Sequence, residues 1–169
     1  MNRLSKTVSA LILIAAFFSI PAQAGTTTEA FEKLKSLVGH WETVGAADKG
    51  TLDLQLTSGG SVLLERSHEI IDGKPVDMTT MYFVDGDHLR MTHYCMAGNQ
   101  PTMQATYAPE SKTITFDFVS ATNMKTPDDG HMHHAVYTLI DNDHLKMVWT
   151  FRKNQKDSFS EDISYVRTK

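Results

Sequence analysis

Apolar and polar residues alternate along most of this 169-residue chain. Because successive side chains of a β-strand point to opposite faces, such alternation indicates strands with one buried face. Residues 52–56 and 113–119 show the pattern most clearly, and turn sequences such as Ser58-Gly59-Gly60 and Asp85-Gly86-Asp87 separate the runs. The pattern predicts strands at residues 52–56, 61–70, 77–84, 88–95, 102–107, 113–119, 131–140, 144–152 and 158–166.

Roughly nine or ten short strands joined mostly by hairpin-length turns predict an all-β fold, an antiparallel up-and-down β-barrel. Closing the sheet into a barrel would remove its exposed edges. A barrel of this size encloses either packed side chains or a cavity for one small ligand. A short helix, capped by Thr27 or Thr28 and ending before Gly39, is predicted from apolar residues at helical spacing: Phe31, Leu34, Leu37 and Val38.

Gly39-His40-Trp41 follows the predicted helix and opens the first strand. Glycine permits a bend at this point, and tryptophan is large enough to plug one end of a barrel. The tripeptide resembles the Gly-x-Trp opening of lipocalins and related calycin-type barrels. The resemblance implies that Arg167, near the end of the last strand, packs over Trp41, a cation–aromatic contact worth about 0.5 to 2 kcal/mol.

Two further segments, residues 92–101 and 131–133, resemble a group of exported bacterial lipocalin-like proteins of uncharacterised function. The architectural resemblance to lipocalins covers most of residues 31–167. It implies a fold and leaves the reaction, if there is one, open.

The first 24 residues have the pattern of an export signal. Arg3 and Lys6 form a positive start, an apolar run covers residues 11–20, and Ala22-Gln23-Ala24 is a small-x-small cleavage site. The apolar run is too short to span a bilayer, so we expect no stable membrane insertion. These features predict a periplasmic or secreted protein that begins near Gly25.

Removal of residues 1–24 from the 169 leaves 145, a length that suits a single domain at residues 25–169. Two of the 16 basic residues lie in the leader, so 14 remain against 20 acidic residues, a net charge of −6. A nucleic-acid partner is therefore not expected, and a small molecule is the expected partner.

Two short stretches place imidazole or thiol groups two residues apart: His93 with Cys95, and His131 with His133. On a strand this spacing sends both members to one face. If the two pairs face one cavity, the three histidines would suit an open catalytic zinc site. With the thiol included, the set would suit structural zinc or cuprous copper.

Strand parity predicts that His93 and Cys95 point inward, because they share a face with the apolar Leu89 and Met91. Cys95 is the only cysteine, which excludes an intramolecular disulfide. A free cysteine is most often a buried small hydrophobic residue, and a reactive thiol or metal ligand is the alternative.

The strand that begins at His131 has no clear apolar face. If the face of Tyr137 is buried, His131 and His133 point inward; if the face of Val136 is buried, His134 does. A bulge near His133 could also change the parity along the strand.

The sequence therefore favours a barrel that binds a small, largely apolar molecule in its interior cavity. The alternative is a metal-dependent (zinc or copper) enzyme, a histidine-based acid/base enzyme or a copper-handling protein. Motifs of serine hydrolases, phosphate-binding loops and helical zinc proteases are absent from the sequence. The residues expected to contact the ligand are His93, Asn99, Gln100, Tyr137, Trp149 and Met91, and the candidate metal ligands are His93, Cys95, His131 and His133.

Overall fold

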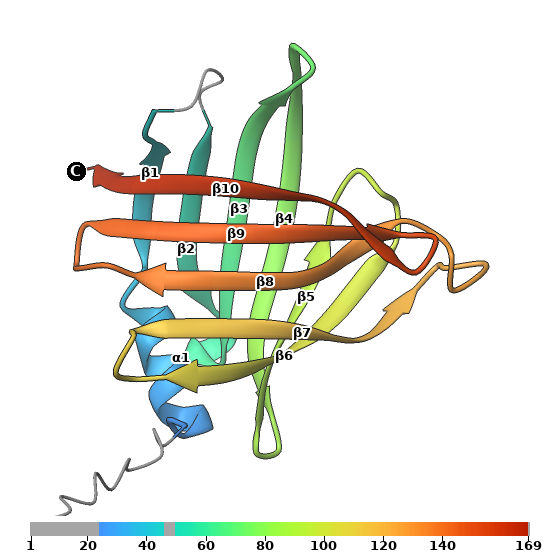
Figure 1. Cartoon of the computed structure of the whole chain (residues 1–169). Helices are drawn as coiled ribbons and strands as arrows, with labels where there is room; N and C mark the ends of the chain where they lie inside the picture. Colours follow the sequence, from blue (N-terminus) through green and yellow to red (C-terminus); the bar gives the residue numbers. More distant parts are fainter. Residues whose placement is uncertain (1–23, 46–49, 169) are drawn as a thin grey trace, which may run out of the picture.

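The structure is a computed structural model that describes residues 24–45 and 50–168. Within them a closed antiparallel barrel of ten strands follows one short helix (Figure 1). Each strand pairs with its neighbours in the chain, and β10 pairs with β1 to close the barrel. The elements are α1 (Thr27–Lys35), β1 (Gly39–Thr43), β2 (Thr51–Thr57), β3 (Val62–Ile71), β4 (Lys74–Asp85), β5 (His88–Tyr94), β6 (Gln100–Ala108), β7 (Thr113–Thr122), β8 (His131–Leu139), β9 (His144–Lys153) and β10 (Lys156–Thr168).

The predicted up-and-down barrel with a short N-terminal helix is confirmed. Each predicted strand is present, and its ends lie within three residues of the prediction. The predicted leader, by contrast, falls almost entirely on residues 1–23, which lie outside the described residues. No helix within the described residues is long and apolar enough to cross a membrane.

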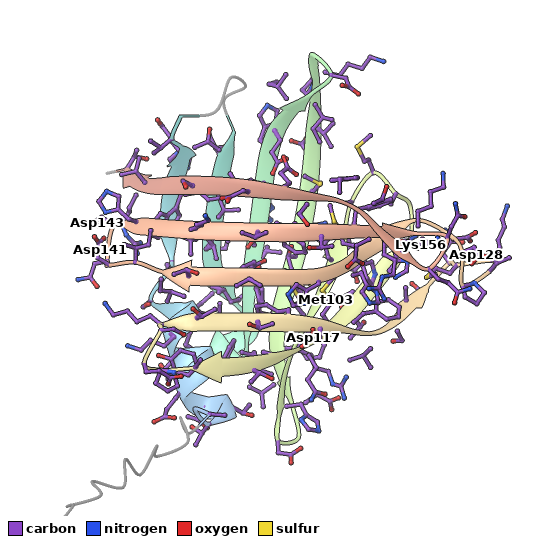
Figure 2. All side chains as sticks on the ribbon, viewed as in Figure 1. Met103, Asp117, Asp128, Asp141, Asp143 and Lys156 are labelled. Carbon is purple, nitrogen blue, oxygen red and sulfur yellow. The ribbon has the colours of Figure 1, made fainter. Side chains whose placement is uncertain are left out.

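The up-and-down order gives the barrel two different ends (Figure 1). Helix α1 and the turns between β4 and β5, β6 and β7, and β8 and β9 lie at one end, which we call the closed end. The connections between β3 and β4, β5 and β6, β7 and β8, and β9 and β10 lie at the other, which we call the mouth. Figure 2 shows Asp141 and Asp143 at the closed end and Asp128 and Lys156 at the mouth.

The N-cap of helix α1 lies one residue before the first predicted cap, Thr27. Its N-cap is Thr26, whose hydroxyl accepts a hydrogen bond from the backbone N–H of Glu29, while the Glu29 carboxylate accepts from the Thr26 N–H. This reciprocal pair satisfies N–H groups that lack partners inside the helix. The helix turns its apolar face toward the barrel and buries Ala30, Phe31 and Leu34.

Trp41 plugs the closed end, as the lipocalin resemblance implied. Its side chain is fully buried, and its indole N–H donates to the carbonyl of Leu37 at 2.8 Å. The guanidinium of Arg167 lies over the ring at 4.2 Å and donates to the carbonyls of Ser36, Val38 and Asn142. Arg167 therefore ties the last strand to the segment between α1 and β1.

Gly39 is required by this arrangement. Its φ of +141° lies in a region that other residues rarely adopt. A Cβ at this position would come within 2.8 Å of the Arg167 Nη1. Glycine thus allows both the bend into β1 and the close approach of the guanidinium.

We expect Arg167→Lys to lower the free energy of unfolding by about 1 to 3 kcal/mol. A lysine ammonium is a point charge and cannot span three carbonyls while also covering the indole face. Urea unfolding followed by circular dichroism measures the change. Arg66→Lys, at an exposed position on β3, is the matched control and should change stability by less than about 0.5 kcal/mol. Equal effects of the two substitutions would contradict this role of Arg167.

Candidate functional site

A chain of hydrogen-bonded polar side chains crosses the middle of the barrel. Tyr82 donates to the carboxyl of Glu65 at 2.5 Å, and Thr80 donates to its other oxygen at 3.1 Å. Because the Tyr82 proton is engaged, Tyr137 donates to the Tyr82 oxygen, at 2.8 Å. These polar residues are at most 4% exposed, so they satisfy one another away from water.

His93 ends this chain on the side of the mouth. Its Nδ1 lies 2.9 Å from the Thr80 hydroxyl, which already donates to Glu65, so the histidine Nδ1–H is the donor. The Nε2 atom of His93 therefore carries a lone pair, and this atom is buried with no hydrogen-bond partner. The imidazole packs against Trp149, with ring centroids 4.7 Å apart.

Burial controls the ionisation of these groups. It lowers the pKa of His93 to about 4, so the imidazole is neutral at physiological pH. It raises the pKa of Glu65 to about 7, although the hydrogen bonds from Tyr82 and Thr80 act in the opposite direction. Burial and the nearby Glu65 also raise the pKa values of Tyr82 and Tyr137, which stay protonated as donors.

Above His93 the interior narrows to a space that we call the passage. It holds only about 20 Å³ of free volume, and the residues that line it are Leu52, Glu65, Ser67, Glu69, Met78, His93, Met132, Met147, Trp149, Glu161, Ile163 and Tyr165. The passage leads to a larger, mostly apolar hollow, which we call the mouth cavity. That cavity has a volume of about 600 Å³ and is lined mainly by Ile71, Met78, Ala97, Met132, Phe151 and Phe159.

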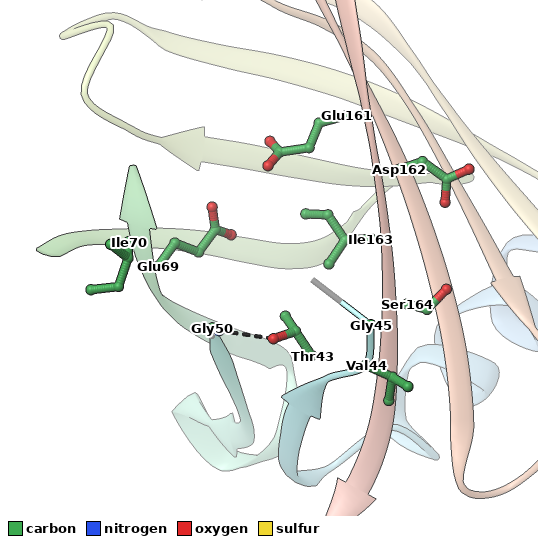
Figure 3. Close-up of a pocket in the computed structure, with 10 residues that line it drawn as sticks. All are labelled: Thr43, Val44, Gly45, Gly50, Glu69, Ile70, Glu161, Asp162, Ile163 and Ser164. Atoms are coloured by element: carbon green, nitrogen blue, oxygen red, sulfur yellow. Dashed lines mark hydrogen bonds between the residues drawn. The ribbon is translucent and has the colours of Figure 1, made fainter. Parts of the chain in front are cut away.

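Two glutamates line the passage and also the cavities next to it. Glu161 lines both the passage and the mouth cavity, and Glu69 lines the passage. Both side chains also reach into a side cavity of about 310 Å³ between the ends of β1, β3 and β10 (Figure 3). Burial and the charge of Glu161 raise the pKa of Glu69 to about 7, and burial raises the pKa of Glu161.

The structure separates His93 from Cys95. His93 points inward, as strand parity predicted, but β5 ends at Tyr94. Cys95 lies in the loop beyond the strand, where it lines the mouth cavity and is only partly buried. Burial raises the pKa of the thiol, which keeps it protonated.

A bulge decides the orientation of the histidines in β8. Between β8 and β9 the pairing register shifts between Met132 and His134, which leaves His133 as the extra residue. Beyond the bulge Tyr137 is buried, so its face is the inner one, and His134 pairs outside with Asp117 at 2.9 Å. Before the bulge Met132 lines the passage.

His131 and His133 lie next to each other, and both imidazole rings pack against the aromatic ring of Phe118. Their ring centroids lie 4.6 and 5.0 Å from that ring. His131 accepts at Nε2 from the Nδ1–H of His133 over 3.0 Å, because its own Nδ1–H donates to the Asp129 carbonyl. No three His, Cys, Asp or Glu side chains within the described residues are placed to hold a metal ion. The four candidate ligands are thus not assembled into a metal site.

The other residues that were expected to contact the ligand lie in three different environments. Trp149 lines the passage, while Met91 and Tyr137 are fully buried in the packed core. Asn99 donates to the carbonyl of Gly130 at 2.8 Å, which ties the β5–β6 loop to the start of β8. Gln100 bonds within the same region, to Thr122 and Gly98. Asn99 and Gln100 therefore organise the mouth.

Sequence reasoning missed the three glutamates. A signal for them exists, because Glu65, Ser67 and Glu69 continue the inward face of Leu63 along β3. In the same way Glu161 shares the inward face of Tyr165 in β10. Polar residues at such positions mark a cavity or a buried network in a barrel.

Comparison with known proteins gives a structural match only. No family model and no curated protein matches the sequence. The structure resembles the crystal structure of Rv2717c from M. tuberculosis, with a TM-score of 0.62 and 16% sequence identity. The match covers 83% of this chain and 98% of that chain. This likeness shows the fold alone.

We expect Glu65→Gln to change how stability depends on pH. The native carboxyl has a raised pKa, so between pH 4.5 and about 7 the unfolded chain releases this proton before the native protein does. Glu65 therefore lowers the free energy of unfolding by about 3 kcal/mol as the pH rises through this range. Urea unfolding at a series of pH values should show that the difference between the wild type and Glu65→Gln shrinks by about this amount.

Glu42→Gln, at an exposed position on β1, is the control and should follow the wild-type profile. A constant difference between wild type and Glu65→Gln from pH 4.5 to 8 would contradict the protonation of buried Glu65.

Proposed function

We propose that this barrel binds a small, largely apolar molecule at its mouth, with one polar group of the ligand in the passage. The observation that carries the proposal is the mouth cavity, which adjoins the passage lined by His93, a residue whose buried Nε2 has no hydrogen-bond partner among the described residues. Its volume of about 600 Å³ lies in the range of small-molecule sites, about 300 to 1,000 Å³. Such sites combine an apolar lining with a few polar groups that orient the ligand.

The closed end supports a lipocalin-like assignment for the same barrel. Gly39, Trp41 and Arg167 have the arrangement that the resemblance implies, with the cation over the indole. A plug at one end and an apolar cavity at the other are what a carrier of one small molecule needs.

Acid/base catalysis at His93 is a second candidate. One observation favours it, the hydrogen-bonded series from His93 through Thr80 to Glu65. The pKa of His93, about 4, makes its imidazole a weak base at neutral pH, so the geometry favours binding.

We expect the neutral fluorescent probe N-phenyl-1-naphthylamine to bind the purified, delipidated protein with increased emission. Met132→Gln should weaken this binding about five- to tenfold, because it places an amide in the apolar lining. Fluorescence titration measures the affinity.

Met81→Gln is the matched control, since Met81 is 40% exposed on the outer face of β4. It should bind the probe as the wild type does. No saturable binding to the wild type, or equal loss in both variants, would refute an apolar site at the mouth.

We also propose that the barrel, residues 25–169, acts after export as a single domain. The support is the leader pattern of residues 1–24. Expression of the full chain in a Gram-negative host should yield a periplasmic protein whose intact mass corresponds to a start at Gly25. A full-length cytoplasmic product, alongside correct processing of a co-expressed exported control protein, would contradict export.

A further inference from the structure

The polar side chains that line the passage carry more acceptors than donors: three carboxyl groups and one imidazole, against the hydroxyl groups of Ser67 and Tyr165. Glu69 and Glu161 present carboxylates, and His93 presents the Nε2 lone pair. Glu65 lies below them and already accepts from Tyr82 and Thr80. Because acceptors cannot satisfy one another, a ligand group that pairs with them must supply donors.

The electrostatic environment favours a positive donor. No lysine or arginine is among the described residues that line the passage, the mouth cavity or the side cavity. Glu69, on β3, and Glu161, on β10, reach into the same space near the end of β1 (Figure 3). Glu69 is partly buried and Glu161 is more exposed, and neither has a cationic side chain beside it among the described lining residues. A cation between the two carboxylates would therefore be favourable.

His93 is the independent observation that this space receives a ligand. The residue is only 4% exposed, and its Nε2 has no hydrogen-bond partner within the described residues. A buried acceptor without a partner is uncommon in native proteins and calls for an explanation. Its imidazole lines the passage beside Glu161, and the aromatic face of Trp149, which also attracts cations, lies next to it.

We propose that the barrel selects an apolar molecule that carries a protonated primary amine, with the ammonium group held by Glu161, Glu69 and His93. An ammonium has three N–H donors and a positive charge, which match two carboxylates and one lone pair. The apolar body would lie in the mouth cavity, which meets the passage at Met78, Met132 and Glu161. This inference rests on the proposed function and names the class of ligand.

The experiment compares three ligands that share one apolar chain and differ in the head group: decylamine, decanol and decanoate. Each competes with N-phenyl-1-naphthylamine for the delipidated protein at pH 8, below the concentration at which it forms micelles. We expect decylamine to displace the probe at concentrations at least about tenfold lower than decanol, and decanoate to be the weakest.

The outcomes separate the two proposals. If decanol equals decylamine, or decanoate binds best, the amine selectivity is wrong and the apolar site stands. If the probe does not bind the wild type at all, the proposed function fails and this inference fails with it.

Glu161→Gln tests the assigned partner of the ammonium. The substitution is nearly isosteric and lies at an exposed position, so we expect the protein to fold. It should weaken decylamine about tenfold and leave decanol within about twofold of the wild type. Glu69→Gln should act in the same direction, and the exposed Glu42→Gln should change neither ligand. Unchanged decylamine binding in both Glu161→Gln and Glu69→Gln would overturn the inference.

Discussion

The carboxyl group of Glu65 lies buried in the middle of the barrel, and the polar half of the interior is arranged around it. A buried carboxyl must be hydrogen-bonded, so Tyr82 and Thr80 turn their hydroxyl protons toward it. Because the Thr80 proton is given to Glu65, Thr80 accepts from His93. The Nε2 of His93, a residue that lines the passage, is then left without a hydrogen-bond partner among the described residues. One buried group thus sets the orientation of the atom that we assign to ligand binding.

The two ends of the barrel divide stability from binding. At the closed end, Trp41, Leu34 and Leu37 are buried and Arg167 covers the indole. At the mouth, the cavity has an apolar lining and is open to its surroundings. The carboxyl groups of Glu69 and Glu161, whose pKa values are raised, lie next to this cavity. No lysine or arginine is among the described residues that line these spaces, and partial burial of such carboxylates costs stability. Carboxylates with raised pKa values are more frequent at functional sites than elsewhere.

Much of the fold could be predicted because alternation is a local property. The period of two identified nine of the ten strands, and the apolar neighbours Leu89 and Met91 placed His93 inward. Within the described residues the four candidate metal ligands do not form one cluster, for reasons that no local pattern carries. Cys95 lies beyond the last residue of β5, and the bulge at His133 directs the β8 histidines toward Phe118.

The sequence by itself determined the strands, the closed barrel and the plug formed by Gly39, Trp41 and Arg167, since these follow from side-chain period and a short motif. Only the tertiary structure decided which inward groups meet. Glu69 and Glu161 are far apart in the chain, and closure through β1 and β10 brings them to one space. The physical reason is that strand period sets the face of a residue, whereas register, bulges and closure set its neighbours.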